Sequence, residues 1–287
     1  MNIIVDIFNK LNMNVDGIKK IGGMTNTNYL VLCGNNKFVA RIPGLASNDM
    51  IDRSIEKENQ ILTSEYGFNV PTIFFDKKTG IKITKFLEST TLKPYNINEY
   101  SSLIALTLKK LHTSNIPFKN VFEPKIEFKK YLSLMKDKQH FVISDFQKSI
   151  KLFDNLCDKI IDINKKDKFY KLSPTHGDIV PENLLYHNKK IYVIDWEYSG
   201  LNDPCWDVTS LILESTGFDD LSIPSGIKLE KFISEYNKDL NLKKVEIYKS
   251  IQDILWSAWA IVKINAGGDY SKYAKDRLYR AFERESV

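Results

Sequence analysis

The fold prediction rests on two stretches that follow one another closely, THGDIVPENLL at residues 175–185 and IYVIDWEYSG at residues 191–200. Each combines a short apolar run with polar side chains. Histidine, aspartate, asparagine and glutamate are residue types that bind ions or move protons in enzyme sites. The candidates in these stretches are His176, Asp178, Asn183, Asp195 and Glu197.

Apolar runs on either side of the polar residues 187–190 predict a β-hairpin. We expect Tyr186 to pair with Tyr192 in this hairpin. Asn183 then lies opposite Asp195, so the two ends of a short ribbon present an amide oxygen and a carboxylate to one point.

Asp178, on the loop before the hairpin, faces the same point. Two oxygen ligands beside a third carboxylate suit Mg²⁺, which binds one or two protein carboxylates and completes its shell with phosphate oxygens. Phosphoryl transfer needs such an ion and a residue that orients the attacking hydroxyl. We therefore assign Asn183 and Asp195 as metal ligands and Asp178 as the base. The alternative is a hydrogen-bonded loop that caps a helix.

The composition indicates a globular protein with room for one large domain or two unequal lobes, at 287 residues and 43% hydrophobic content. The net charge is +5, but the basic residues are scattered, so nucleic-acid binding is not expected. Three widely spaced cysteines, Cys33, Cys157 and Cys205, indicate a reducing compartment. Residues 1–20 lack the apolar core of a signal peptide or membrane span, so we expect a cytoplasmic protein without membrane insertion.

The first part of the chain has strand-like patterns. Residues 18–42 predict an antiparallel meander around the loop GGMTNTN, residues 49–66 predict a helix, and a hairpin joins VPTIFF to IKITKFL. After Glu88 a polar, turn-rich stretch leads into helical periodicity, so we divide the chain into a small lobe, 1–88, and a larger lobe, 89–287. The helices expected in the larger lobe span 98–112, 126–137, 144–163 with Ser144 as N-cap, 207–216, 229–240, 245–266 and 269–285.

The spacing H-x-D-x-x-x-x-N, followed by a second Asp, resembles the catalytic motif of the eukaryotic-like kinase superfamily in its small-molecule branch. Residues 176–178 stand where protein kinases carry H-R-D, and residues 195–197 where they carry D-F-G. The resemblance implies an α+β, protein-kinase-like two-lobe fold, with an antiparallel sheet and a helix in the N-terminal lobe and a mainly helical C-terminal lobe. We expect His176 to brace the catalytic loop, because Asp178 already supplies the proton acceptor.

The resemblance also places a nucleotide in the first lobe. Arg41 stands where kinases carry their phosphate-pairing lysine, and an arginine fork can bind phosphate bidentately. We expect Glu58 to orient it, because Glu58 shares a helix face with apolar residues whereas Glu56 points to water. The glycine-rich loop, with Thr25, Asn26, Thr27 and Asn28, would cover the phosphates, although alone it also fits an ordinary hairpin loop; Lys85, Phe86 and Leu87 occupy the adenine-binding hinge position.

DWEYSG at residues 195–200, a later W-D, a W-x-x-W pair and a terminal Y-x-x-Y-A-x-x-R run resemble the choline kinase family, in its bacterial type, over nearly the whole chain. A quaternary ammonium has no N–H to donate, so ring faces and a carboxylate recognise it best. On spacing alone the aromatic pairs fit a hydrophobic core better than a binding site. The resemblance implies that Asp207 supports the catalytic loop and that the acceptor is held by Glu197, Tyr198, Glu214, Trp256, Trp259, Tyr270 and Tyr273.

We interpret the chain as an ATP-dependent choline kinase that uses Mg²⁺ and releases phosphocholine and ADP. The same chemistry on ethanolamine, a thiamine-like alcohol or an aminoglycoside is the alternative. A non-enzymatic choline-binding module is disfavoured, because Asp178, Asn183 and Asp195 are all present. The oligomeric state is not predicted.

Overall fold

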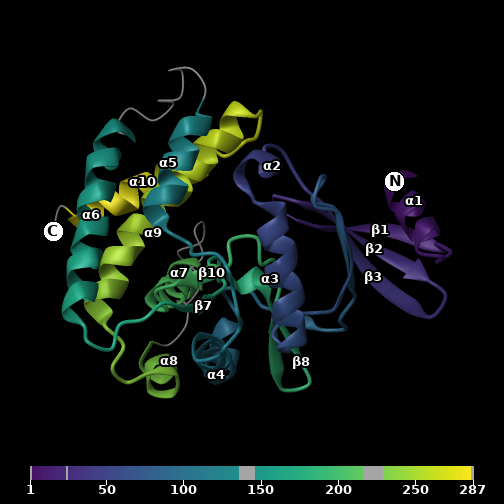
Figure 1. The fold of residues 1–287 in the computed structure, drawn as a ribbon, viewed down its shortest axis with the longest axis horizontal. Helices are drawn as coiled ribbons and strands as arrows, with labels where there is room; N and C mark the ends of the chain where they lie inside the picture. Colours follow the sequence, from purple (N-terminus) through teal and green to yellow (C-terminus); the bar gives the residue numbers. More distant parts are fainter. Residues whose placement is uncertain (1, 24, 136–145, 216–228, 286–287) are drawn as a thin grey trace.

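The computed structural model describes residues 2–23, 25–135, 146–215 and 229–285. A β-rich N-terminal lobe and a helical C-terminal lobe meet along helix α3, which stands between them in Figure 1. The protein-kinase-like, α+β two-lobe fold predicted from the sequence is therefore confirmed. Within the described ranges no helix combines the length and apolarity needed to cross a membrane.

The N-terminal lobe is built on a five-stranded antiparallel sheet in the order β1-β2-β3-β5-β4. Helix α1, Asn2–Lys10, packs Ile4 and Phe8 against the sheet residues Val31 and Phe38; this helix was not predicted. The strands are β1 (Gly17–Gly22), β2 (Thr27–Cys33), β3 (Asn36–Ile42), β4 (Thr72–Phe75) and β5 (Lys82–Lys85).

The helix expected at residues 49–66 is two helices, α2 (Ser47–Met50) and α3 (Arg53–Glu65). The break occurs because Asp52 caps α3, accepting the backbone N–H groups of Ser54 at 2.9 Å and Ile55 at 3.2 Å. Helix α2 packs against α5 of the other lobe. The link between β3 and α3 therefore lies in the N-terminal lobe by sequence but packs against the C-terminal lobe through α2.

The C-terminal lobe is organised around α9, whose side chains are buried on nearly all faces. One apolar cluster joins α9 to α5, α6, α7 and α10, and a second lies among α4, α7, α8 and the small strands. The predicted cap Ser144 lies outside the described residues. The helices are η1 (Ile97–Tyr100), α4 (Ser101–His112), α5 (Pro124–Leu134), α6 (Phe146–Lys166), α7 (Cys205–Ser215), α8 (Leu229–Tyr236), α9 (Leu242–Asn265) and α10 (Ser271–Glu285).

Short strands carry the motif from which the prediction began. They are β6 (Thr90–Thr91), β7 (Ser173–Thr175), β8 (Leu184–His187), β9 (Lys190–Val193) and β10 (Gly200–Asn202), with the turn η3 (Pro181–Asn183) before β8. The hairpin β8–β9 forms, but Tyr186 pairs with Ile191, one residue away from the predicted register. Asn188 and Lys189 have φ of 47° and 60°, so they make a two-residue turn tighter than the expected four-residue one.

Candidate active site

The catalytic-loop candidates sit on a tight backbone turn that Asp207 holds from behind. Asp207, in the first turn of α7, accepts the backbone N–H groups of His176 and Gly177, both at 2.8 Å. Gly177 has φ +86°, and a Cβ there would lie 2.3 Å from the carbonyl oxygen of Tyr198. Only glycine fits this turn, so the loop is held in position before any ligand binds.

Both ring nitrogens of His176 are committed to the backbone. Nε2 lies 2.9 Å from the carbonyl oxygen of Ile194, which can only accept, so Nε2 carries the proton. Nδ1 then accepts the backbone N–H of Asp178 at 3.2 Å. Burial lowers the pKa of the imidazole, which favours the neutral ring. His176 therefore ties the loop of Asp178 to the segment that ends at Asp195, and neither nitrogen is available to move a proton.

Asp178 and Asn183 lie side by side. The Asn183 Nδ2 donates to the carbonyl oxygen of Asp178 at 3.0 Å and to its Oδ2 at 3.4 Å. The Asn183 Oδ1 is left as the atom that a cation would bind. Burial, together with the charges of Glu214 and Asp195, raises the pKa of Asp178 from 3.8 to about 8. The carboxyl can thus exchange a proton near neutral pH.

Asp195 has a left-handed backbone conformation, with φ 68°, which is uncommon for a residue other than glycine. Its Oδ1 lies 2.5 Å from Arg41 Nη1 and 3.2 Å from Lys82 Nζ. The Asp195 side chain is 27% exposed, whereas those of Arg41 and Lys82 are 4% and 7% exposed. The carboxylate of Asp195 is therefore the open edge of an otherwise buried group of charges.

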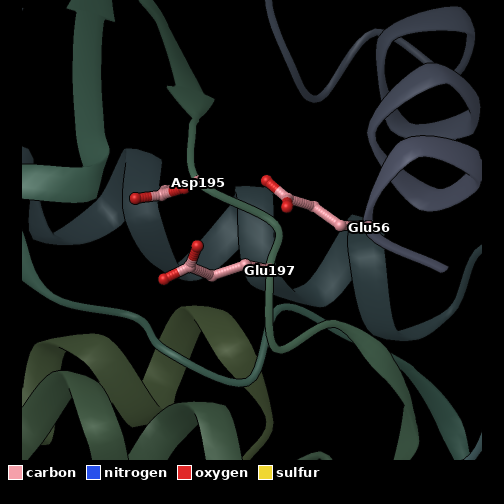
Figure 2. A group of neighbouring side chains, drawn as sticks. All are labelled: Glu56, Asp195 and Glu197. Carbon is pink, nitrogen blue, oxygen red and sulfur yellow. The ribbon is translucent and has the colours of Figure 1, made fainter. Parts of the chain in front are cut away.

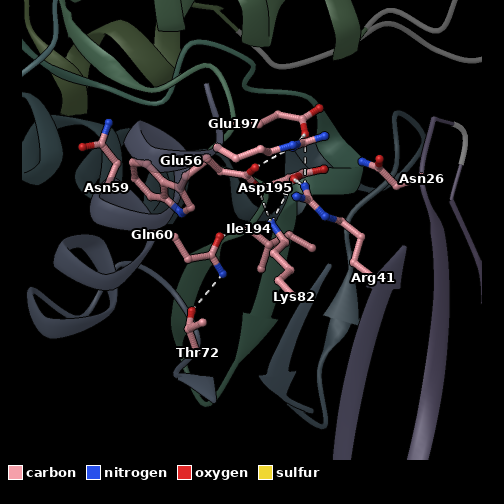
Figure 3. A network of polar contacts seen from close by, with 12 residues as sticks. Asn26, Arg41, Glu56, Asn59, Gln60, Thr72, Lys82, Ile194, Asp195 and Glu197 are labelled. Carbon is pink, nitrogen blue, oxygen red and sulfur yellow. Dashed lines mark hydrogen bonds and ion pairs between the residues drawn. The ribbon is translucent and has the colours of Figure 1, made fainter. Parts of the chain in front are cut away.

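Figure 3 shows that group, in which side chains from the sheet, α3 and the segment after β9 converge. Glu56 is fully buried and contacts three cations: Arg41, Arg53 Nη1 at 2.6 Å and Lys82 Nζ at 3.2 Å. Burial opposes the ionisation of Glu56, but these cations lower its pKa. The cluster balances three carboxylates with three cations: Glu56, Asp195, Glu197, Arg41, Arg53 and Lys82.

The predicted partner of Arg41, Glu58, is wrong. The carboxylate that contacts Arg41 is Glu56, while Glu58 is 47% exposed and pairs with the exposed Lys119 at 3.1 Å. The reason is that the buried face of α3 is polar. It carries Arg53, Glu56, Asn59, Gln60 and Thr63, so the apolar residues that guided the prediction do not mark the inward face.

A divalent ion finds suitable donors at the open side of this cluster. Oxygens of Glu56, Asp195 and Glu197 lie within 4.8 Å of one another (Figure 2), and an all-oxygen set suits Mg²⁺. Glu56 is fully buried among its three cations, whereas Asp195 is partly exposed. The backbone N–H of Ile194 donates to the Asn183 carbonyl at 2.9 Å, which keeps Asn183 beside Asp195. Asp195 and Asn183 thus fit the ion, with Glu197 near it.

The glycine-rich loop is folded onto the end of β3. Gly23 has φ +118°, and a Cβ there would lie 1.9 Å from the Asn26 carbonyl; one on Gly44 would lie 1.9 Å from the Thr25 carbonyl. The Asn26 Oδ1 accepts the Gly44 N–H at 3.3 Å. Thr27 and Asn28 begin β2, where Asn28 pairs with Arg41. The loop therefore lies next to the cation at the end of β3.

At the hinge position, Lys85 ends β5 and is exposed, and Phe86 and Leu87 follow it half-buried. The Phe86 N–H donates to the Lys37 carbonyl at 3.0 Å, which extends the pairing of β5 with β3. The Phe86 N–H is therefore already used, and a nucleobase would have to form its hydrogen bonds with other main-chain groups of this segment.

The aromatic candidates of the acceptor site gather around the C-terminal half of α9, with Tyr198 from the segment after β9, Tyr270 from the residue before α10 and Tyr273 from the start of α10. Tyr198 meets Trp256 edge to face at a ring-centroid distance of 5.1 Å, and Trp259 meets Tyr270 at 5.3 Å and Tyr273 at 6.1 Å. Gly267, with φ +91°, turns the chain so that α10 folds back onto α9. Both indoles are 6% exposed and belong to the apolar core of the lobe. The rings thus form one cluster that is part core.

A cavity of about 370 Å³ opens beside this cluster, between the two lobes. Its lining combines the glycine-rich loop and the link after β3 with the turn between α9 and α10: Thr25, Gly44, Leu45, Lys263, Gly268, Asp269 and Tyr270. A larger hollow, of about 530 Å³, lies among α6, α9 and α10 and contains none of the candidate residues.

Glu214 is paired with an arginine that was not assigned a role. Its Oε1 lies 2.5 Å from Arg277 Nη2, and the Arg277 guanidinium stacks 4.5 Å from the ring centroid of Tyr273. Arg277 also contacts the buried Asp253 at 3.1 Å. The carboxylate near Asp178 is therefore already neutralised by a buried cation.

Two further cations of the site, Lys82 and Arg53, were also missed. Lys82 pairs directly with Arg41 across β5 and β3, and like charges placed so are stable only with carboxylates between them. A lysine inside the otherwise apolar strand pattern IKITKF was the available signal for Lys82. Arg53 gave none beyond its place in the first turn of the helix.

Comparison with known proteins agrees with this geometry. Residues 18–282 match the family model of choline/ethanolamine kinases. Protein LicA of Haemophilus influenzae is 35% identical over 97% of this chain and 82% of its own length. A crystal structure of choline kinase LicA from Streptococcus pneumoniae superposes with a TM-score of 0.87 at 31% identity, covering 99% of this chain and 98% of that one. A structure of LicA in complex with AMP gives a TM-score of 0.85 at 31% identity, over 99% and 97% of the two chains. This chain belongs to the choline/ethanolamine kinase family.

Proposed function

We propose that the protein transfers the γ-phosphoryl group of ATP to the hydroxyl of choline, giving phosphocholine and ADP. The observation that carries the proposal is the position of Asp178, which is close enough to Asp195 and Glu197 of the charge cluster on one side, and to Tyr198 and Tyr273 of the aromatic cluster on the other, for their electrostatic effects to reach each other. The relatives named as choline kinase, and the one bound to AMP, support both halves. Three buried cysteines without disulfides and the use of ATP favour the cytoplasm.

The nucleotide phosphates would be held by cations that now hold carboxylates. Arg41 and Lys82 share the Asp195 Oδ1, and the Arg41 Nε is buried without an acceptor among the described residues. Phosphate oxygens would replace the carboxylate as partners of these cations. Asp195 and Asn183 would then be available to Mg²⁺, which supplies neutralisation of the phosphate charge. The glycine-rich loop and the hinge segment after Lys85 would contact the rest of the nucleotide.

Asp178 would orient the choline hydroxyl and accept its proton as the phosphorus–oxygen bond forms. A base works best when its pKa lies near the operating pH, and the pKa of Asp178 is raised to about 8 in the ligand-free protein. The Asn183 Nδ2 donates to the Oδ2 of the Asp178 carboxylate. Asp207 accepts the backbone N–H groups of the two residues before Asp178 and so fixes the loop. His176 contributes by bracing, since both its nitrogens are bonded.

The trimethylammonium group would lie against the rings of α9 and α10. A primary ammonium such as that of ethanolamine needs hydrogen-bond acceptors, and the Glu214 Oε1 is already engaged by Arg277 at 2.5 Å. Ring faces of Trp256, Trp259 and Tyr198 attract a cation that donates no hydrogen bond. This distribution favours choline over ethanolamine, with Glu214 and Glu197 as the nearby carboxylates.

Coupled measurement of ADP release tests the proposal. The purified protein with MgATP is offered choline, ethanolamine, thiamine or kanamycin, and the Asp178→Asn variant reports the background. We expect the highest kcat/KM for choline and no acceptor-dependent turnover in the variant. ADP release that choline does not stimulate, or a higher kcat/KM for another acceptor, would refute the substrate assignment.

A further inference from the structure

Lys263 is a buried cation at the seam between the lobes. It lies in the last turn of α9, is 3% exposed, and lines the cavity between the lobes. Its Nζ donates to the Leu45 carbonyl at 2.5 Å and to the Ser47 Oγ at 3.1 Å, and lies 5.4 Å from the ring centroid of Trp259. The Lys263 ammonium thus joins α9, which carries Trp256 and Trp259, to the link between β3 and α3.

The partners of Lys263 are all neutral. Within the described residues no carboxylate lies within salt-bridge distance of its Nζ, and burial lowers its pKa, which the more distant charge of Glu197 offsets only in part. A buried charge is costly when no opposite charge is paired with it. A methionine or leucine would fill the same space at lower cost, so the lysine has a use other than packing.

That use follows from what the tethered link connects. Arg41 lies in the strand before the link, and Glu56 lies in the helix after it, so the link runs between the two partners of a buried ion pair. Within the link, Met50 and Ile51 are buried in the core of the C-terminal lobe together with Trp259. The link therefore joins the strand of Arg41 to the helix of Glu56 and packs in the same core cluster as Trp259.

We propose that Lys263 is a positioning residue that couples the acceptor pocket to the phosphate site through residues 45–47. A nucleotide at Arg41 orders the link from one end, and choline at Trp259 orders α9 and, through Lys263, the same link from the other. The ligand that binds first bears the ordering cost, so the second binds more tightly, and by linkage the enhancement is equal in both directions. The choline half of this inference rests on the proposed function.

Calorimetric titration measures the coupling directly. The Kd of choline is determined with and without a non-hydrolysable ATP analogue and Mg²⁺, and the Kd of the analogue with and without choline. We expect roughly ten-fold mutual enhancement in the wild-type protein. Lys263→Met should reduce it to below about two-fold, Ser47→Ala should reduce it in part, and the double variant should resemble Lys263→Met, because the two changes remove one interaction.

A matched control is Lys272→Met, which removes an exposed lysine of α10 that pairs with Asp276 at 2.8 Å. It should leave the enhancement at the wild-type value. If Lys263 had a purely structural role, Lys263→Met would change the stability and both Kd values, but the factor by which each ligand enhances binding of the other would stay at the wild-type value. Absence of enhancement in the wild-type protein, or full enhancement in Lys263→Met, would overturn the proposal.

Hydrogen exchange tests the tether without reference to the acceptor. Amides of residues 44–51 should exchange several-fold faster in Lys263→Met than in the wild-type protein, and the ATP analogue should slow them in both. If choline neither binds nor reacts, the proposed function fails, yet this measurement still decides on the tether. Unchanged exchange in Lys263→Met would then overturn it.

Discussion

Replacing Glu56 by glutamine, with Glu58→Gln as its control, tests the charge cluster. The two glutamates lie two residues apart on α3 and undergo the same chemical change. Glu56 is fully buried against Arg41, Arg53 and Lys82, whereas Glu58 is 47% exposed and pairs with Lys119, which is 80% exposed. Any difference between the variants therefore reports the environment of the side chain.

The expected magnitude follows from the charges. Without the Glu56 carboxylate, three buried cations face only two carboxylates, and breaking a buried ion pair from one side costs about 3–5 kcal/mol. We expect Glu56→Gln to lower the free energy of unfolding by about 3 kcal/mol, since glutamine keeps one acceptor oxygen, and the melting temperature by about 6–12 °C. Glu58→Gln should cost less than about 0.5 kcal/mol.

Urea denaturation at several pH values is the assay. The cations hold the pKa of Glu56 below its ordinary 4.5 against the effect of burial. The stabilisation is therefore fully present above pH 4.5 and is lost as the pH falls through the lower, folded-state pKa. The gap between wild type and Glu56→Gln should close in acid. Equal losses in the two variants, or a gap that stays constant down to pH 2, would refute the reasoning.

Three further predictions concern catalysis. Asp178→Asn should lower kcat by at least about 10²-fold. It should also raise the melting temperature, by an amount that grows from pH 3.8 to about pH 8 and is then constant, because over that range the unfolded carboxyl is ionised while the folded one keeps its proton. Turnover and melting at pH 4, pH 6 and pH 9 check both. Trp259→Ala should raise the KM for choline by about 5–30-fold, the equivalent of 1–2 kcal/mol, with a much smaller change in the KM for ATP in steady-state assays. Removal of Mg²⁺ with EDTA should abolish ADP release, and added Mg²⁺ should restore it.

Local pattern was sufficient for most of the architecture. Turn residues bounded the strands of the sheet, and apolar periodicity located the helices of the C-terminal lobe. The spacing from Asp178 to Asn183 and Asp195 predicted that these side chains lie close together, and the structure places Asn183 against Asp178 and beside the segment that ends at Asp195. These features depend on neighbours close in the sequence.

The errors arose where distant segments decide the outcome. Apolar residues pointed to Glu58, but the inward face of α3 is polar because the sheet brings Arg41 and Lys82 there from 15 and 26 residues away. The hairpin register followed from two left-handed residues, Asn188 and Lys189, whose conformation the sequence pattern did not specify. In each case the outcome depends on the three-dimensional arrangement of the chain, which the local sequence pattern does not specify.

The charge balance of the cluster limits which ligand can enter the site. Its three carboxylates already neutralise its three cations, so a bare Mg²⁺ would meet Asp195 already paired with Arg41 and Lys82. A nucleotide without the ion would draw the same cations from Asp195 and leave that carboxylate facing the phosphates. The metal–nucleotide complex would replace both partners at once, because it would offer phosphate oxygens to the cations and a cation to the carboxylate. In the proposed function, the buried neutrality of the site would therefore favour the complex over either component.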